Sequence, residues 1–149
     1  MIRYNWHVPD SPDLTDSDYR ALGTFRYQIR RFQHFSEQAA KDEGLEPQQH
    51  QMLLAIRSLG ISTPAPTIGD LAQHLLIRHH SAVGMIDRLA GRGLVERVKA
   101  EEDRRQVRVR LTSAGCLRLQ HLSRIHREEL RQSGPLLVET LRHLLERQA

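Results

Sequence analysis

The sequence lacks the features of an exported or membrane-bound protein. Its 149 residues include one cysteine, Cys116, so no disulfide can form within the chain and a reducing compartment is expected. No apolar run approaches the roughly 20 residues that span a bilayer. The opening residues, MIRYNWHVPDSPD, contain no apolar stretch of the kind found in a signal peptide. These absences predict a cytoplasmic protein without a membrane partner.

Motifs that indicate catalysis, a cofactor or a metal are missing too. The sequence has no glycine-rich phosphate loop, no G-x-S-x-G, no H-E-x-x-H and no C-x-x-C. Nine histidines suggest a metal site, but the adjacent His79 and His80 diverge by about 100° on a helix. His121 and His126 are five residues apart and miss the spacing that puts two side chains on one helix face. We expect no enzyme activity, no cofactor and no bound metal.

The clearest pattern of helices and strands runs from Thr67 to Leu111. Thr67 and Asp70 have the spacing of a helix N-cap and its reciprocal partner, and apolar residues then recur at helical spacing. A second helix is predicted over 79–92. Gly93 should end it, because glycine favours the position that follows a helix.

Two strands are predicted after this pair of helices. The runs LVERVK (94–99) and VRVRL (107–111) are rich in β-branched residues. The loop between them, AEEDRRQ, is charged and has no apolar anchor, which suits an exposed hairpin tip. Two short helices followed by a hairpin predict a winged helix-turn-helix within a mainly α fold.

The order of the motifs GDLA, RHHSAV, DRLAGRGLVER and EEDRRQVRVRLTSAG resembles the MarR family of bacterial transcription regulators. The most diagnostic part is the family's wing pattern D-x-R-x-x-x-V-x-L-T, which the chain matches from Asp103 and Arg105 to Thr112. The resemblance implies a homodimeric, sequence-specific regulator of transcription that binds double-stranded DNA at an inverted repeat. It also implies that the protein is a repressor that a small aromatic or amphipathic effector releases from DNA.

Charge is concentrated in the same segment. Between Arg78 and Arg110 the chain has nine basic and five acidic residues, and this difference of +4 equals the formal net charge of the whole chain. A basic surface is often no more than a solvated face. Because this one coincides with a helix-turn-helix pattern, we interpret it as a DNA-binding surface.

The second helix of the pair should enter the major groove with its N-terminal end first. We expect Val83, Ile86 and Ala90 to point inward. The opposite face then holds three predicted DNA-contacting residues: Ser81, Gly84 and Arg88. The entry turn holds three more, which can reach phosphates or base edges: Arg78, His79 and His80. Two alternatives stay open, since a neighbouring helix could require Gly84 and an acidic neighbour, Asp87 or Glu96, could pair with Arg88.

The wing has a separate role by the same resemblance. It implies that Asp103 orients Arg105 and that Arg105 reaches the minor groove, where narrow A·T tracts attract arginine. Arg104 is an alternative for the inserted side chain.

Further helices are predicted on both sides of this segment. A long helix should run from the capping pair Thr15 and Asp18 to Gly44, and Pro47 should open a shorter one. Thr112 is expected to cap another long helix. The sequence Ser133-Gly134-Pro135 should break it before a last, strongly apolar helix.

These flanking helices carry more apolar residues than a small winged domain can cover. We therefore expect one MarR-like domain in which 1–46 and 113–149 form dimerisation helices around a DNA-binding region, 47–112. The alternative is that the terminal helices pack on each other within a monomer.

An effector pocket between the dimerisation helices and the winged region is also implied by the resemblance. Five residues have the right chemistry near that junction, although each is also a plausible core residue: Phe25, Phe32, Phe35, His50 and Met52. Three other interpretations remain: a redox-responsive regulator that uses Cys116, a metal-responsive regulator, and a winged-helix adaptor that binds proteins instead of DNA.

Overall fold

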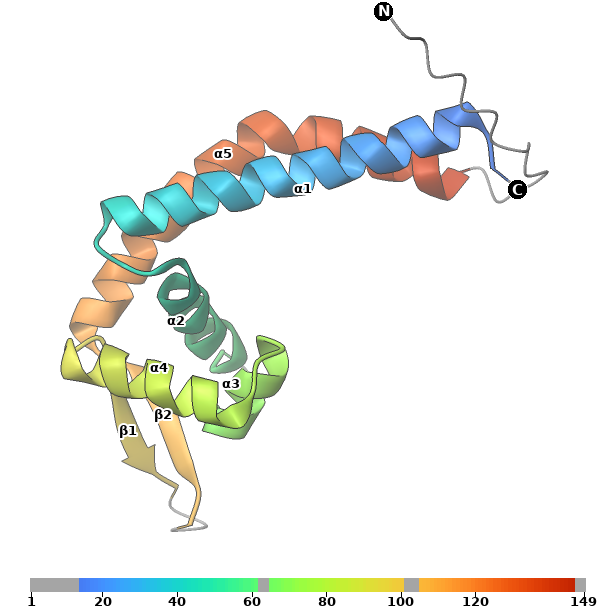
Figure 1. Ribbon diagram of the computed structural model, residues 1–149. Coiled ribbons are helices and arrows are strands. Elements are labelled where there is room, and N and C mark those ends of the chain that lie inside the picture. The colour runs from blue at the N-terminus through green and yellow to red at the C-terminus, as the bar shows by residue number, and fades with distance from the viewer. Residues whose placement is uncertain (1–13, 62–64, 101–104, 147–149) are drawn as a thin grey trace, which may run out of the picture. The chain divides into compact units, whose positions relative to one another are not determined.

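A computed structural model describes residues 14–61, 65–100 and 105–146. The order of elements in these residues is α1 (Asp16–Asp42), α2 (Pro47–Leu59), α3 (Ile68–His74), α4 (His79–Gly91), β1 (Val95–Lys99), β2 (Val107–Leu111) and α5 (Ser113–Glu146) (Figure 1). The predicted fold class, mainly α with a small hairpin, is confirmed. None of the described helices combines the length and the apolar character needed to cross a membrane.

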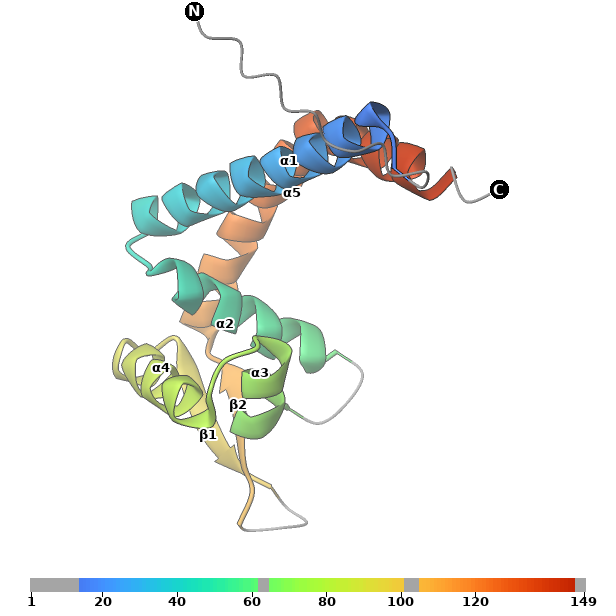
Figure 2. The same cartoon turned by 45° about the vertical axis from the view of Figure 1, so that its right-hand side comes forward.

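The described residues divide into two compact units. Residues 35–128 form the winged unit, which holds α2, α3, α4, both strands and the first part of α5. The residues before 35 and after 128 form the helical unit, in which α1 and α5 run side by side (Figures 1 and 2). Within the helical unit, Ser17 Oγ lies 3.1 Å from His143 Nε2.

The ends of the helices follow local signals in the sequence. The backbone N–H of Thr67 donates to Asp70 Oδ2 over 2.9 Å, and the Asp70 N–H donates to Thr67 Oγ1 over 3.1 Å. The same exchange opens α1, where the Thr15 N–H donates to Asp18 Oδ2 over 2.7 Å. Gly93, just past α4, has a φ of +69°, which an L-residue with a side chain rarely adopts. The predicted caps at these positions are confirmed.

One prediction about the helices was wrong. Ser133-Gly134-Pro135 does not break the chain, because α5 continues from Ser113 to Glu146 with Pro135 inside it. Proline removes one backbone donor and crowds the preceding turn, yet packing in the folded protein routinely overrides such local preferences. The Ser133 hydroxyl follows the helix and donates to the Glu129 carbonyl over 2.9 Å.

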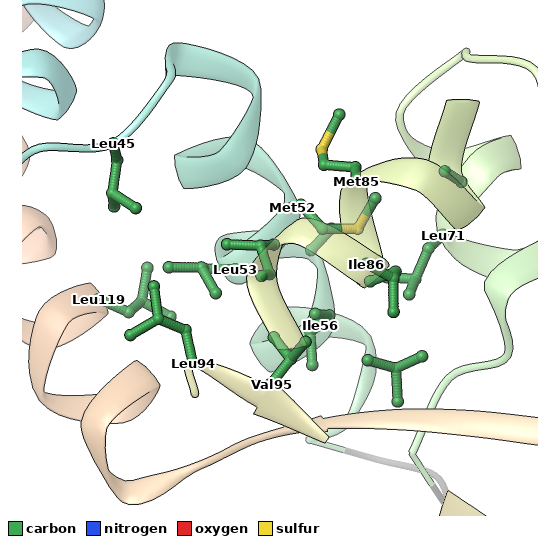
Figure 3. Packing of buried hydrophobic residues seen from close by; sticks show 14 of the residues in the cluster. Leu45, Met52, Leu53, Ile56, Leu71, Met85, Ile86, Leu94, Val95 and Leu119 are labelled. Carbon is green, nitrogen blue, oxygen red and sulfur yellow. The ribbon is translucent and has the colours of Figure 1, made fainter. Parts of the chain in front are cut away.

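The hydrophobic core lies in the winged unit and is built around α2. Met52, Leu53 and Ile56 project from α2 and are buried against the facing sides of α3 and α4 (Figure 3). The cluster also includes Leu94, which precedes β1, two strand residues and two residues of α5: Val95, Val109, Leu119 and Leu122. This core fixes the two helices of the helix-turn-helix against the base of the wing.

The wing is a two-stranded antiparallel sheet that is attached to the helix-turn-helix on one side. Val95 pairs with Leu111 and Lys99 with Val107. On the other edge of β2, the Val109 N–H donates to the Pro66 carbonyl over 2.9 Å, and Arg108 Nη1 donates to the Ala65 carbonyl over 2.8 Å. The segment that leads into α3 therefore holds the base of the wing in place.

Candidate nucleic-acid interface

The turn between α3 and α4 has an unusual residue at its centre. Leu76 has a φ of 56° and its side chain is 92% exposed. The Ile77 N–H donates to the Ala72 carbonyl and the Leu76 N–H to the Gln73 carbonyl, which together make a Schellman motif. Glycine usually occupies this position, because the left-handed conformation costs other residues roughly 1–2 kcal/mol. Leu76 could not be predicted from the sequence, since nothing in its residue type marks it as a turn.

Helix α4 is rotated slightly from the predicted orientation. Four residues form its buried face: Ala82, Met85, Ile86 and Leu89. Ile86 was expected there, but Val83 is only partly buried and does not belong to the core cluster. Ala90 is also partly buried and packs at the edge of the core. Met85, which is 3% exposed, belongs to the buried face instead.

The outward face of α4 contains the predicted groove-contacting residues. Ser81 and Arg88 are exposed, and Gly84 lies between them on the same side of the helix. A Cβ atom at Gly84 would meet only Arg88 Nη1, at 3.5 Å, and no atom of another helix within 4 Å. The alternative that a neighbouring helix requires this glycine is therefore wrong.

Arg88 is not engaged by either of its acidic neighbours. Asp87 Oδ1 lies 2.6 Å from Arg97 Nη2, and Glu96 Oε1 lies 2.6 Å from Arg110 Nε. Within the part of the chain that the structure describes, no ion pair includes Arg88. Its guanidinium group is therefore available to an external acceptor, and the alternative of pairing with Asp87 or Glu96 is wrong.

The first turn of α4 presents basic and polar side chains beside unpaired backbone donors. Arg78 is the N-cap residue, with φ −71° and ψ 149°, and makes no side-chain cap. Arg78, His79 and His80 are all exposed. The first N–H groups of a helix have no acceptor within it and favour an anion. This end of α4 can therefore bind phosphate oxygens.

The basic residues of this segment do not all face outward. Arg92 Nη1 donates to Gln49 Oε1 over 3.1 Å, and Arg108 is bound to Ala65 as described above. Arg97 of β1 pairs with Asp87 of α4, and Arg110 of β2 pairs with Glu96 of β1. The count of charges in the sequence could not separate these structural arginines from those free to meet a ligand.

The predicted wing contacts are only partly within the described residues. Asp103 and Arg104 lie outside them. Arg105 is exposed in the turn that precedes β2. Its role and the predicted pairing with Asp103 stay predictions.

The five residues predicted for an effector pocket are divided between the two units of the structure. Met52 is fully buried in the core, and Phe25 and Phe32 belong to the helical unit. Phe35 packs edge-on against His126, with ring centroids 5.6 Å apart. A shared role for these residues stays a prediction. Among the described residues, no three metal-binding side chains lie close enough to hold an ion.

His50 sits in an unfavourable position for a charge. Its ring is 2% exposed and lies 4.6 Å from the ring of His126, centroid to centroid. Burial, and then the neighbouring His126, lower the pKa of His50 from 6.5 to about 4. Its Nδ1 is buried and has no hydrogen-bond partner among the described residues. His50 is therefore neutral at physiological pH.

Comparisons with known proteins agree with this geometry. Residues 43–106 match the model of the MarR family. The fold is similar to that of wild-type MarR from E. coli, with 23% identity and a TM-score of 0.67 over 81% of this chain and 90% of that chain. It is also similar to AbsC, a MarR family transcriptional regulator from Streptomyces coelicolor, with 23% identity, a TM-score of 0.66 and 80% coverage of each chain. A MepR mutant of S. aureus bound to an oligodeoxyribonucleotide shares 19% identity and a TM-score of 0.63 over 85% of this chain and 97% of that one. No curated protein matches the sequence.

Proposed function

We propose that this chain is a MarR-family winged helix-turn-helix, DNA-binding transcription regulator and that it acts as a homodimeric repressor of an inverted-repeat operator. In this proposal α4 reads the major groove and the wing contacts the minor groove. A small amphipathic effector then lowers the affinity for DNA by favouring another spacing of the two α4 helices.

The outward face of α4 carries this proposal. Ser81 and Arg88 are exposed and Gly84 lies between them on the same side of the helix. Arg88 has no ion-pair partner among the described residues, because its two acidic neighbours bind other arginines. An arginine held in this way can make a bidentate contact with guanine, the commonest specific contact in the major groove. The MepR structure that is similar to this chain was solved with an oligodeoxyribonucleotide, and mutant E. coli MarR was solved with operator DNA.

The wing supplies the second part of the contact. Arg105 precedes β2, and β2 is joined to the residues before α3 by the hydrogen bond from the Val109 N–H to the Pro66 carbonyl. Asp103 and Arg104 complete the proposed group of wing residues. Arg105→Ala should weaken operator binding and make the affinity less steeply dependent on salt, because one phosphate-neutralising charge is lost.

The helical unit is the proposed dimerisation surface. Leu130, Val138, Leu141 and Leu145 are exposed and lie on one side of α5, where a second copy of the chain would cover them. We assign the parts of 1–46 and 113–149 that carry such residues to dimerisation, and 47–112 to DNA binding. Two α4 helices in one dimer would contact half-sites roughly 10 bp apart, centre to centre.

Selection of DNA fragments by the purified protein tests the proposal. We expect enrichment of an inverted repeat, with binding that falls steeply as salt rises. Arg88→Ala should then reduce affinity for the selected site about 10- to 100-fold and relax the preference at one base pair. Arg124→Ala, which removes another exposed arginine, is the matched control and should change neither. A protein-interaction adaptor would give no sequence-selective enrichment.

A further inference from the structure

The exposed side of α1 in the helical unit carries charge of one sign. Between residues 19 and 34 the helix has four arginines and no acidic residue. All four are exposed: Arg20, Arg26, Arg30 and Arg31. Among the residues that the structure describes, no ion pair includes any of them. Four uncompensated positive charges therefore lie along about 17 Å of helix.

The part of α5 in the same unit shows how an ordinary solvated helix differs. Its residues 129–146 interleave three glutamates with two arginines, and Arg142 pairs with Glu146, four residues further on, at 3.9 Å. Pairs of opposite charge at this spacing stabilise a helix, whereas like charges destabilise it. Arg26 and Arg30 have the same spacing and the same charge. The arginines of α1 therefore do not stabilise their own helix, and their common charge suits a polyanionic partner.

Two exposed tyrosines lie among these arginines. Tyr19 is 50% exposed and Tyr27 is 59% exposed. Residues four apart lie on one side of a helix, so Gly23 lies between the two rings, and a Cβ atom there would meet nothing within 4 Å. The opposite side of α1 is half-buried and includes Phe25 and Ile29. The tyrosine rings are therefore accessible, with open space between them.

Arginines interleaved with accessible aromatic rings suit a nucleic-acid strand whose bases are unpaired. Guanidinium groups bind phosphate oxygens, and aromatic rings stack on bases, whose faces are accessible in a single strand. An anionic membrane surface would also attract the charge, but a helix that lies in a membrane surface needs a broad apolar face. Among the exposed residues of 19–34, Leu22 is the one aliphatic side chain. The chemistry of this side of α1 therefore favours nucleic acid over a membrane.

We propose that this side of α1 is a second nucleic-acid site, which binds a single strand of RNA or DNA through five residues: Tyr19, Arg20, Tyr27, Arg30 and Arg31. The arginines bind the phosphates and the tyrosines stack on two of the bases. The site belongs to the helical unit, whereas α4 belongs to the winged unit. The proposal goes beyond operator binding and does not rest on it.

Fluorescence anisotropy with a labelled single strand tests the aromatic contacts. DNA and RNA strands of the same mixed sequence show which of the two binds more tightly, and the DNA duplex of that sequence is titrated beside them. Tyr27→Ala should weaken binding of the strand about tenfold, because stacking on one base is lost, and should change the duplex affinity little. Tyr27→Phe keeps the ring and should bind the strand as the wild type does. An unchanged strand affinity in Tyr27→Ala, or an equal loss for strand and duplex, would overturn the proposal.

The dependence of strand affinity on salt tests the phosphate contacts. Arg30→Gln should weaken binding of the strand and reduce the slope of log affinity against log salt by about 0.7, since one phosphate contact is lost. Arg142→Gln is the matched control, because Arg142 is an exposed arginine of the same unit that pairs with Glu146. It should leave the affinity and the slope near those of the wild type. Equal effects of the two variants would mean that net charge alone attracts the strand, and would overturn the site on α1.

Titration of the strand into protein already saturated with the selected operator tests whether the two sites are separate. The strand should still bind, and Arg30→Gln should leave operator affinity unchanged. Displacement of the strand by the operator would place it at α4 and overturn the proposal. If the protein selects no operator, the proposed function fails while the two anisotropy experiments still decide this site.

Two further outcomes would assign this side of α1 to another partner. Phosphatidylglycerol vesicles that bind the wild type and not Arg30→Gln, together with no binding of the strand, would make it a membrane-binding surface. Dissociation of the dimer by Tyr27→Ala, measured by sedimentation, would show that a second copy of the chain covers it. Either result would overturn the proposal.

Discussion

The winged unit and the helical unit differ in how they bury apolar side chains. In the winged unit, residues from α2, α3, α4, both strands and α5 close over one core in which Leu53, Ile86 and Leu122 are fully buried. In the helical unit, Val138 and Leu145 are 52% and 75% exposed. A unit with a closed core can keep its fold by itself, whereas an exposed apolar stripe favours association with another surface. The comparison predicts that a disruptive mutation in the winged unit unfolds the protein, whereas one on the exposed stripe of the helical unit dissociates the dimer.

Removing a buried side chain from the winged unit should have the largest effect on stability. Leu53→Ala deletes a fully buried side chain from the centre of the core, so we expect the free energy of unfolding to fall by about 2–5 kcal/mol. Urea denaturation followed by circular dichroism measures this change. The neighbouring Leu54 is 41% exposed, and Leu54→Ala should cost less than about 1 kcal/mol. Similar losses for both variants would contradict the closed core.

Acid should destabilise the winged unit through His50. Because the pKa of His50 is lowered from its ordinary value of 6.5 to about 4 in the folded protein, the unfolded chain binds the proton more tightly. The contribution of His50 to the free energy of unfolding is therefore fully present above pH 6.5. It is lost as the pH falls toward 4, by an amount on the order of 3 kcal/mol. The midpoint of urea denaturation should fall across this range.

His50→Met supplies the control for the acid effect. Methionine has a similar length and no charge to acquire, so the variant should lose less stability between pH 6.5 and 4 than the wild type. If both proteins respond equally to pH, other groups cause the acid sensitivity and His50 is not buried as described.

Charge placed on the exposed stripe of α5 should dissociate the proposed dimer without unfolding the winged unit. Val138→Lys removes one apolar contact from each copy, and we expect the dimer to weaken at least about tenfold. Light scattering and sedimentation over a range of protein concentrations measure this change. The unfolding of the winged core should stay near that of the wild type, apart from the contribution of dimerisation.

Leu136→Lys is the matched control for the stripe. Leu136 is 54% exposed, nearly the same as Val138, but it lies on another side of α5 among Gln132, Glu139 and His143. The control should leave the dimer intact. Equal dissociation by both variants would mean that the stripe is not the specific contact surface.

The local parts of this fold could be predicted from the sequence, and the non-local parts could not. Thr67, Asp70 and Gly93 act on their own turn of helix, so residue type and spacing are enough to place them. Pro135 is also a local signal, but packing over the length of α5 overrides it. The failure at Pro135 shows where tertiary packing decides the structure.

The same distinction applies at the site. The outward face of α4 follows from helical periodicity, and Ser81 and Arg88 are exposed there with Gly84 between them. Which arginines are free depends on contacts between elements. Arg110 pairs with Glu96 because the register of the two strands puts them opposite each other. The number of charged residues along the chain does not reveal this register.

Gly84→Ala should change stability and DNA binding in opposite directions, both by small amounts. An added Cβ meets only Arg88 Nη1, at 3.5 Å, so alanine should raise the free energy of unfolding by up to about 1 kcal/mol. If glycine is there to let the backbone approach DNA, the same variant should bind the selected DNA more weakly.

Gly91→Ala is the control, because Gly91 is exposed at the other end of α4 and a Cβ there meets no atom within 4 Å. It should not weaken DNA binding. A Gly84→Ala protein that binds DNA as tightly as Gly91→Ala would show that α4 does not approach DNA at this residue, and Arg88 would then have to make its contact from a greater distance.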